Sequence, residues 1–371
     1  MIVSDITNLI EQFAPLHFAE SFDNVGLLIG NSNQKVSKVL VTLDTLETVV
    51  DEAIEKKCNL IISFHPIIFK GLKKINGNDY VERVVIKAIQ HNIAIYAIHT
   101  ALDNHWQGVN HMMCEKLGLI NQEILIPKAE TIKKLTVFVP NKAFDKVQNA
   151  LFEIGAGHIG NYENCSFSNQ GIGSFKGNDS SDPTVGTKNE LHKAEEIQLQ
   201  LTFSAHLKRK VISTLHKTHP YEEVAYEIST LENLNQKIGM GMIGELPEAI
   251  PEEEALQLVK DSFDSKGIRY SAFLNKPIKK IAVLGGSGAF AIKNAMRAKA
   301  DLFVTADIKY HEFYQAENQL IVADIGHYES EQYTKNLIVT LLRKKISNFA
   351  SIFNLEDIIL SEINTNPIKY F

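Results

Sequence analysis

The feature that most constrains this chain is a repeated alternation of short apolar runs with longer amphipathic stretches in the first 120 residues. Strands are expected at 35–44, 59–64 and 93–100, and helices at 5–14, 46–57, 80–92 and 109–119. The apolar runs are continuous, as in strands buried on both faces, and the stretches between them have helical spacing. Because strands that alternate with helices pair in parallel, this part predicts an α/β layer.

The pattern changes from about residue 131. Strands are expected at 133–140, 195–203 and 222–229, and helices at 142–155 and 205–219. This order resembles a split βαβ, ferredoxin-like unit. Between its halves lies a segment rich in Gly, Ser, Asn and Asp, residues 169–193, which is either a long hairpin loop or a mobile flap.

The α/β pattern returns after residue 251. Helices are expected at 252–263, 289–300 and 330–346, and strands at 278–286, 301–306, 319–326 and 355–363. The middle unit is therefore predicted to be inserted into one larger α/β domain. The expected boundaries are 1–128 and 235–371 for the two halves of that domain and 131–232 for the insert.

Composition excludes several classes of protein. Of the 371 residues, 44% are hydrophobic and 22% charged, the balance of a globular protein with enough apolar surface for two or three cores. A net charge of −6 disfavours a nucleic-acid-binding role. The three cysteines form no C-x-x-C pair, and no signal peptide or 20-residue apolar run is present, so we expect a cytoplasmic protein without a membrane anchor.

Potential metal ligands follow three of the expected strands. His65 ends one strand, His99 and Asp103 end the next, and His327 and Glu331 follow the strand at 319–326. Ligands bind at the carboxyl ends of parallel strands, and imidazole and carboxylate are ligands of Zn²⁺, Fe²⁺ and Mn²⁺. His327 and Glu331 lie one helical turn apart and can reach one ion or ion pair. A single strand-end histidine is more often structural, but three such ends together favour a metal site.

Two further strand ends allow a catalytic or a structural interpretation. Asp307 and His311 have helical spacing and suit proton transfer, or Asp307 caps a helix and His311 is an ordinary hydrogen-bonded residue. In "VLGGSGAFAI", Gly285, Gly286 and Gly288 either direct backbone N–H groups at an anion or allow close packing of a strand against a helix.

Two other polar stretches also remain open. Asp23 and Asn24 precede a strand and either line the same cleft or form an Asx turn. The stretch "HPYEEVAYEI", which begins at His219, is either a second ligand or interface site or a polar turn that leads into an edge strand.

Together these motifs resemble one family. The segments "SFDNVGLLIG", "SFHPIIFKGLKKI", "YAIHTALDNHWQGVN", "IAVLGGSGAF", "VTADIKYHEF" and "DIGHYESE" are similar, in order and over nearly the whole chain, to the GTP cyclohydrolase I type 2 homologues, or Nif-three-like family. The insert with "HPYEEVAYEI" resembles the PII-like or CutA-like module of the longer bacterial members. The resemblance implies a composite α/β domain with an inserted ferredoxin-like α+β domain, assembled as a toroidal homohexamer with a dinuclear metal site.

The resemblance also implies roles for particular residues. His65, Asp103, His327 and Glu331 fall on metal-ligand positions, with Glu331 as the bridge and His99 as a further ligand or lining residue. The family commonly has two histidines before the proline, whereas this chain has Phe64 followed by His65. Phenylalanine cannot bind a metal, so one of the two ions should lose a ligand. His105 is a replacement only if its loop folds back.

Two hypotheses about function follow. The first is a metal-dependent hydrolase of a nucleotide or related substrate, with one or two divalent ions (Zn, Fe or Mn) per subunit and His311, Asp307 or His99 moving protons. The second is a non-enzymatic, hexameric metal-binding or regulatory protein whose insert senses a small ligand or a partner. Whether the chain is an enzyme stays open at this stage.

Overall fold

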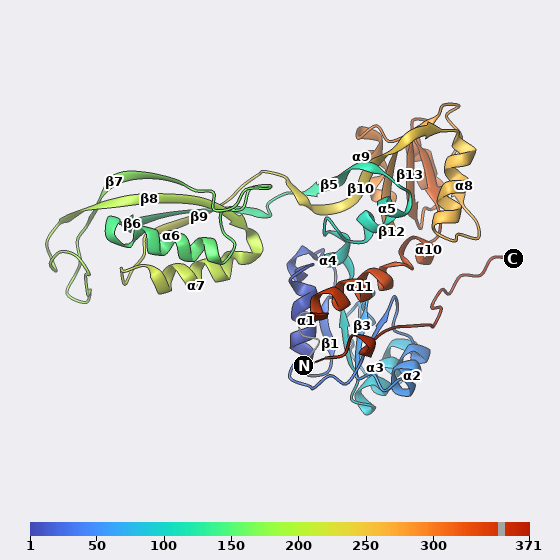
Figure 1. Cartoon of the computed structure of the whole chain (residues 1–371), viewed down its shortest axis with the longest axis horizontal. Coiled ribbons are helices and arrows are strands. Elements are labelled where there is room, and N and C mark those ends of the chain that lie inside the picture. The colour runs from blue at the N-terminus through green and yellow to red at the C-terminus, as the bar shows by residue number, and fades with distance from the viewer. Residues whose placement is uncertain (348–352) are drawn as a thin grey trace. The chain divides into compact units, whose positions relative to one another are not determined.

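The computed structural model describes residues 1–347 and 353–371 and divides the chain into two compact units (Figure 1). Unit 1 comprises Met1–Pro127 and Gln236–Phe371, and unit 2 comprises Lys128–Asn235. Both units are mixed α/β, which confirms the predicted class. None of the helices in the described ranges combines the length and apolar character needed to cross a lipid bilayer.

The first sheet of unit 1 has the strand order β1-β4-β3-β2-β15. Its strands are β1 (Gly26–Ile29), β2 (Val39–Thr42), β3 (Leu60–Ser63), β4 (Ala94–Ala97) and β15 (Ile358–Leu360). All neighbours pair in parallel except β1, which is antiparallel to β4. Since β15 comes from the end of the chain, the C-terminal half completes a sheet that the N-terminal half begins.

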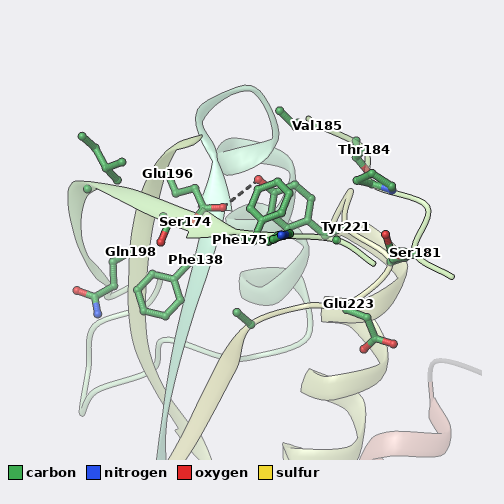
Figure 2. A pocket seen from close by; sticks show the side chains of 18 of the residues that line it. Phe138, Ser174, Phe175, Ser181, Thr184, Val185, Glu196, Gln198, Tyr221 and Glu223 are labelled. Atoms are coloured by element: carbon green, nitrogen blue, oxygen red, sulfur yellow. Dashed lines mark hydrogen bonds between the residues drawn. The ribbon is translucent and has the colours of Figure 1, made fainter. Parts of the chain in front are cut away.

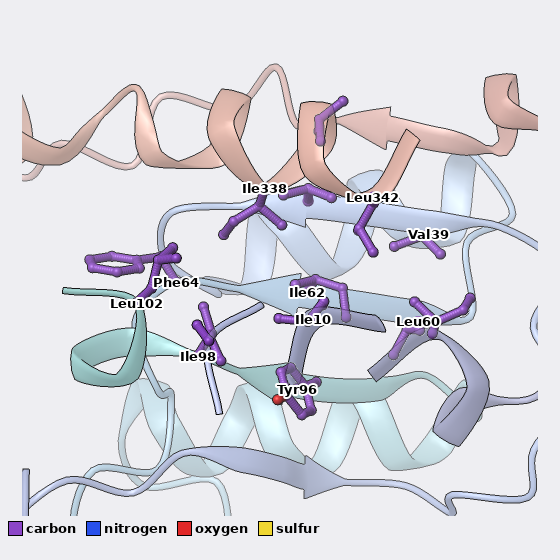
Figure 3. Packing of buried hydrophobic residues seen from close by; sticks show 14 of the residues in the cluster. Ile10, Val39, Leu60, Ile62, Phe64, Tyr96, Ile98, Leu102, Ile338 and Leu342 are labelled. Atoms are coloured by element: carbon purple, nitrogen blue, oxygen red, sulfur yellow. The ribbon is translucent and has the colours of Figure 1, made fainter. Parts of the chain in front are cut away.

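Helices cover both faces of this sheet. They are α1 (Val3–Glu11) and α11 (Thr334–Ile346) on one face, and α2 (Glu47–Glu55) and α3 (Tyr80–Gln90) on the other. Figure 3 shows Ile338 and Leu342 of α11 packed over Val39 and Ile62. The strands are therefore buried on both sides, which explains why their sequences are continuous apolar runs rather than alternating ones.

The second sheet of unit 1 has the order β11-β14-β13-β12-β10-β5. Its strands are β5 (Ile120–Lys128), β10 (Asn235–Ile250), β11 (Arg269–Tyr270), β12 (Ile278–Ser287), β13 (Leu302–Ala306) and β14 (Ile321–Asp324). Strands β12, β13 and β14 are parallel. The accompanying helices are α5 (Val109–Lys116), α8 (Glu252–Ser262), η4 (Ala289–Ala291), α9 (Ile292–Arg297) and η5 (Tyr310–Ala316).

Unit 2 has the element order β-α-β-β-α-β. Its elements are β6 (Ile132–Pro140), α6 (Phe144–Glu153), β7 (Phe167–Phe175), β8 (His192–Ser204), α7 (Lys208–Thr218) and β9 (Tyr226–Thr230). The antiparallel sheet has the order β7-β8-β6-β9. Its core is Leu135, Val137, Leu199 and Leu201 packed with Val211 and Leu215 of α7.

Four strands of the described residues were missed by the sequence analysis, and glycine explains two of these omissions. β7 lies in the segment predicted as a loop or flap, because Gly171, Gly173 and its polar neighbours resemble a turn. Only residues 176–191 connect β7 to β8 as a loop. β5, β10 and the two-residue β11 were also missed; β5 has no glycine, and the polar residues near its start gave no strand pattern. In β10, a Cβ on Gly239 would lie 2.2 Å from the Ile126 carbonyl oxygen, so glycine permits the close approach of β5 rather than a turn.

Candidate metal centre

Three short connections in unit 1 bring a cluster of ligand-type side chains together. His65 lies two residues beyond the end of β3, α4 (His99–Asp103) follows β4, and α10 (His327–Glu331) follows β14. Ligand atoms of His65, His327 and Glu331 all lie within 4.8 Å of one another. The Nε2 atoms of His65 and His327 lie 3.0 and 3.1 Å from the same Glu331 oxygen, Oε2.

An aspartate holds each histidine around this cluster. The Nδ1 atom of His65 lies 2.8 Å from Asp44, that of His99 lies 2.8 Å from Asp23, and that of His327 lies 2.7 Å from Asp307. An Nδ1–H that donates to a carboxylate leaves the Nε2 lone pair free to bind a cation. Metal-binding histidines in proteins characteristically have such a partner.

Two buried carboxylate oxygens lack hydrogen-bond partners. Glu331 is only 3% exposed, and while the two imidazoles are neutral and carry their protons on Nδ1, its Oε2 accepts no hydrogen bond from the described residues. The Oδ1 atom of Asp103 is likewise buried without a partner among the described residues. Unpaired buried carboxylate oxygens are costly, and a bound cation satisfies them. The residues present therefore fit a divalent ion.

The electrostatics of the cluster also favour a positive charge. Burial alone would lower the pKa of His65 and His327, but Glu331 and the paired aspartates raise these pKa values to about 10 and about 11. Burial alone would raise the pKa of Glu331, but the two imidazoles hold it well below its usual range. Burial, and then the charge of Glu331, raise the pKa of Asp103 well above its usual value.

The glycine motif of β12 makes room for the cluster. Gly286 has φ +69°, and a Cβ there would lie 2.5 Å from Glu331 Oε1 and 3.3 Å from His327 Nε2. The N–H groups of Gly285 and Gly286 donate to Asn110 and to the Ser330 hydroxyl. Because both N–H groups have partners, the motif serves close packing rather than anion binding.

The structure separates the two residues predicted to transfer protons. Asp307 contacts the centre through His327 and also accepts from the Ser287 hydroxyl at 2.5 Å. It does not cap a helix, since the N-cap of η5 is Lys309. His311 is exposed on η5 against the rings of Tyr310 and Tyr314 and lines neither cavity beside the centre.

Asp23 and Asn24 have separate roles. The Asp23 carboxylate accepts hydrogen bonds from the backbone N–H and the hydroxyl of Thr100 besides its contact with His99. The Asn24 side chain donates to the Ile68 carbonyl at 2.6 Å. Asp23 thus supports the cleft indirectly, by orienting His99.

Phe64 and His105 occupy structural positions. Phe64 is fully buried in the core below the site, with its ring edge-on to His99 at 5.6 Å. His105 packs against the Phe13 ring at 4.1 Å, and its Nδ1 accepts a hydrogen bond from the backbone of Gln107. Burial lowers the pKa of His105 to about 4. His105 therefore does not replace the missing imidazole.

Two cavities adjoin the cluster. The smaller, about 230 Å³, is lined by His99, Asp103, His327 and Glu331 together with Phe22, Phe290 and the β12 glycines. The larger, about 780 Å³, is lined by Asp44, His65, Asp307 and His327, and by Arg269, Asp324, Glu329 and the C-terminal residues up to Tyr370. His327 lines both cavities, so a ligand in either can approach the centre.

Asp44 is the important residue that the sequence analysis missed. It follows β2, which pairs in parallel with β3, and so lies at the same sheet edge as His65. Its other carboxylate oxygen accepts a hydrogen bond from Thr365 at 2.5 Å. The available signal was its place after a third parallel strand, the criterion that identified His65 and His99.

Comparison with known proteins identifies relatives along the whole chain. The model of the Duf34/NIF3 (NGG1p interacting factor 3) family matches residues 1–367. A Bacillus subtilis protein described as "GTP cyclohydrolase 1 type 2 homolog" is 40% identical over 367 residues, covering 98% of this chain and 97% of its own. A Staphylococcus epidermidis protein of the same description is 35% identical over 371 residues, covering both chains fully.

Solved structures agree with the sequence relatives. The crystal structure of a Bacillus cereus protein related to NIF3 matches with a TM-score of 0.83 and 38% identity, covering 100% of this chain and 99% of that one. A Staphylococcus aureus crystal structure matches with a TM-score of 0.76 and 30% identity over the same shares.

Proposed function

The chain belongs to the Duf34/NIF3 family, as its motifs predicted, and we propose that it is a metal-dependent hydrolase of a nucleotide or related heterocyclic substrate. The observation that carries the proposal is the buried Glu331 Oε2, which lies 3.0 and 3.1 Å from the Nε2 atoms of two imidazoles. With the Nδ1 protons held by aspartates, both Nε2 lone pairs face this oxygen and no donor satisfies it within the described residues. These atoms converge on a common point, as ligands of one ion do.

The donor set suits a transition metal. Two imidazoles and one carboxylate from His65, His327 and Glu331 match sites for Zn²⁺, Fe²⁺ or Mn²⁺. Asp103 and His99 line the adjoining cavity and complete the site. Phe64 stands where the family commonly has another imidazole, so we propose one firmly held ion per chain and weak occupancy of any second position.

Each residue of the centre has a distinct role in the proposed reaction. When bound, a divalent ion lowers the pKa of a water molecule and polarises a substrate oxygen. Glu331 and Asp103 supply the negative charge that retains the cation. Asp44 and Asp307 orient the imidazoles through Nδ1. His99, which Asp23 orients and which faces the smaller cavity, is the proposed proton carrier.

The larger cavity indicates which part of the substrate lies nearest the centre. Its volume of about 780 Å³ accommodates a nucleotide-sized ligand. Besides the two histidines, Arg269 is its one cationic lining residue within the described chain, and its guanidinium is paired with Asp324. Asp44, Asp307 and Glu329 add negative charge. The lining therefore suits an uncharged heterocycle better than a chain of phosphates, and the relatives' description as cyclohydrolase homologues supports such a substrate.

Metal analysis combined with a substrate screen tests the proposal. The purified chain should contain close to one ion of Zn, Fe or Mn, and the loaded protein should convert a member of a nucleoside and nucleotide panel, followed by chromatography. Glu331→Gln should lose both metal and turnover, whereas Glu317→Gln, the same change at an exposed position, should retain both. Metal uptake without turnover across the panel would instead support the non-enzymatic alternative.

We also propose the assembly and the insert type that the resemblance implies. Unit 2 is proposed to be a PII-like or CutA-like module, which its β-α-β-β-α-β order and sheet order support. The chain is proposed to form a homohexamer. Light scattering on the full chain should give a mass six times that of the 41.6 kDa subunit.

A further inference from the structure

A cavity of about 660 Å³ lies entirely within unit 2 and has no part in the metal centre. It occupies the sheet face opposite to α6 and α7, beneath the loop of residues 176–191 (Figure 2). Phe138, Glu196 and Gln198 face it from β6 and β8, and Phe175, Tyr221 and Val185 complete its walls. Its volume is that of a small-molecule site.

The two glycines of β7 create the space. Gly171 pairs with Glu196 and Gly173 with Ala194, so both glycines lie on the cavity face of the sheet. A Cβ on Gly173 would lie only 2.3 Å from Glu196 Oε2. Because neither glycine has a side chain, the space beside the Glu196 carboxylate stays open.

Two hydrogen bonds hold the loop of residues 176–191 to the turn at residues 220–222. The hydroxyl of Thr184 donates to the Pro220 carbonyl at 2.8 Å, and the Asp182 N–H donates to a Glu222 carboxylate oxygen at 2.7 Å. His219 secures the turn that receives these bonds, because its Nε2 lies 3.0 Å from the Phe138 carbonyl and its Nδ1 accepts from the Tyr221 N–H. The "HPYEEV" stretch is thus part of the cavity wall.

One carboxylate inside the cavity is only half satisfied. Glu196 is 9% exposed and accepts a hydrogen bond from the Tyr221 hydroxyl at 2.9 Å through Oε1. Its Oε2, above Gly173, has no hydrogen-bond partner within the described part of the chain. The Tyr221 ring in turn lies 6.2 Å from that of Phe175. A carboxylate oxygen that is open to a cavity beside aromatic faces can accept a hydrogen bond from a cationic ligand.

We propose that unit 2 binds a small organic cation, a primary ammonium or guanidinium group attached to an apolar body. The charged group pairs with Glu196 Oε2, and the apolar body contacts Phe138, Phe175 and Tyr221. The lining charge excludes phosphorylated ligands, since Glu196, Glu222 and Glu223 outnumber Lys176, the single cationic lining residue in the described chain. Hydrogen bonds between charged groups in a buried site are strong and specific.

Calorimetric titration of the full-length protein tests the proposal with phenethylamine and agmatine as probes. Both should bind saturably, whereas 2-phenylethanol and phenylacetate, which lack the cation, should not. Glu196→Gln should weaken binding by about tenfold or more, because it removes the charged partner. Glu195→Gln, the same change at the exposed neighbouring position, should leave affinity unchanged.

Two further measurements keep the test decisive. Tyr221→Phe keeps the aromatic ring but removes the hydrogen bond to Glu196. The variant should have the same melting temperature as the unmodified protein but a different dissociation constant for both amines. Protein stripped with EDTA should bind them as before, because the cavity lies outside the metal centre. Absence of saturable binding by either amine, or equal affinity in Glu196→Gln, would overturn the proposal.

Discussion

The imidazoles of the metal centre are oriented by aspartates that contribute no ligand atom to the cluster of His65, His327 and Glu331. Asp44 is the clearest case, since within the described residues its side chain makes hydrogen bonds to His65 and Thr365 and offers no atom to the cluster. Burial alone would raise the pKa of Asp44, but the hydrogen bond with His65 keeps it below its usual value. Asp44 is therefore an anion that fixes the position of the Nδ1 proton on His65.

Asp44→Asn should weaken metal binding by about 10- to 100-fold while the chain stays folded. An asparagine can present its NH₂ group to Nδ1 and so favour the wrong imidazole tautomer. Competition titration with a chromophoric chelator measures the affinity. Asp51→Asn, at an exposed position of α2, is the matched control and should have no effect. Equal metal affinities in Asp44→Asn and Asp51→Asn would contradict the orienting role of Asp44.

Phe64→His should raise metal content from about one ion to two per chain, because it restores an imidazole beside His65 and His99. The metal-free variant should be less stable by about 1–3 kcal/mol, since a polar ring replaces a fully buried apolar one. Elemental analysis and thermal unfolding measure both effects. Phe64→Leu, which supplies no ligand, should keep one ion. A single ion in Phe64→His would show that position 64 does not face a second metal position.

At the scale of elements, the end of β12 controls how closely α10 approaches the sheet. Gly286→Ala places a methyl group 2.5 Å from Glu331 Oε1 and should displace that carboxylate, with a large loss of metal affinity. Gly118→Ala is the matched control, because Gly118 has a similar φ of +65° with nothing within 4 Å of its Cβ position. Both variants should lose about 1–2 kcal/mol of stability from the left-handed backbone.

The two alanine variants separate backbone strain from crowding. Chemical denaturation should show a loss of stability in both, larger in Gly286→Ala because its methyl group also crowds Glu331, while chelator competition should show a metal defect only in Gly286→Ala. If Gly118→Ala lost as much metal affinity as Gly286→Ala, backbone strain anywhere in unit 1 would be enough to weaken the centre. That result would contradict the packing role proposed for Gly286.

The convergence of β3 and α10 also predicts proton release on metal binding. In the metal-free protein, the pKa values of His65 and His327 are raised to about 10 and about 11, so both imidazoles are cationic at pH 8. Metal binding requires them neutral and should release up to one proton from each, so affinity should rise with pH toward pH 10. Calorimetry in buffers of different ionisation enthalpy counts the protons. Binding without proton release would contradict the raised pKa values.

Continuous apolar runs made much of unit 1 predictable. The runs around Val39, Leu60 and Ala94 indicated buried parallel strands, and polar residues at their ends indicated where His65 and His99 would lie. The strands β7 and β10 could not be recognised, because glycine has the same signature in a turn and in a strand that another backbone approaches closely. Asp44 was missed because a carboxylate after a strand is equally typical of a turn.

At the scale of the whole molecule, the candidate metal centre belongs to unit 1, and the cavity proposed to bind amines belongs to unit 2. Unit 2 has its own hydrophobic core, with Leu135, Val137, Leu199 and Leu215 fully buried. The two chain segments that connect the units are β5 and β10, which are neighbours in the second sheet of unit 1. The insertion points are thus held together by unit 1 itself.

Removal of residues 129–234, with a short Gly-Ser linker joining the ends, should leave a folded protein with its full metal content. The reason is that β10 passes close to β5 near Pro127, where a Cβ on Gly239 would contact Ile126 and Pro127, so a short linker spans the gap. Elemental analysis and thermal unfolding measure the outcome, and loss of phenethylamine binding is the internal control. Loss of metal from a variant that still unfolds cooperatively would show that unit 2 contributes to the centre.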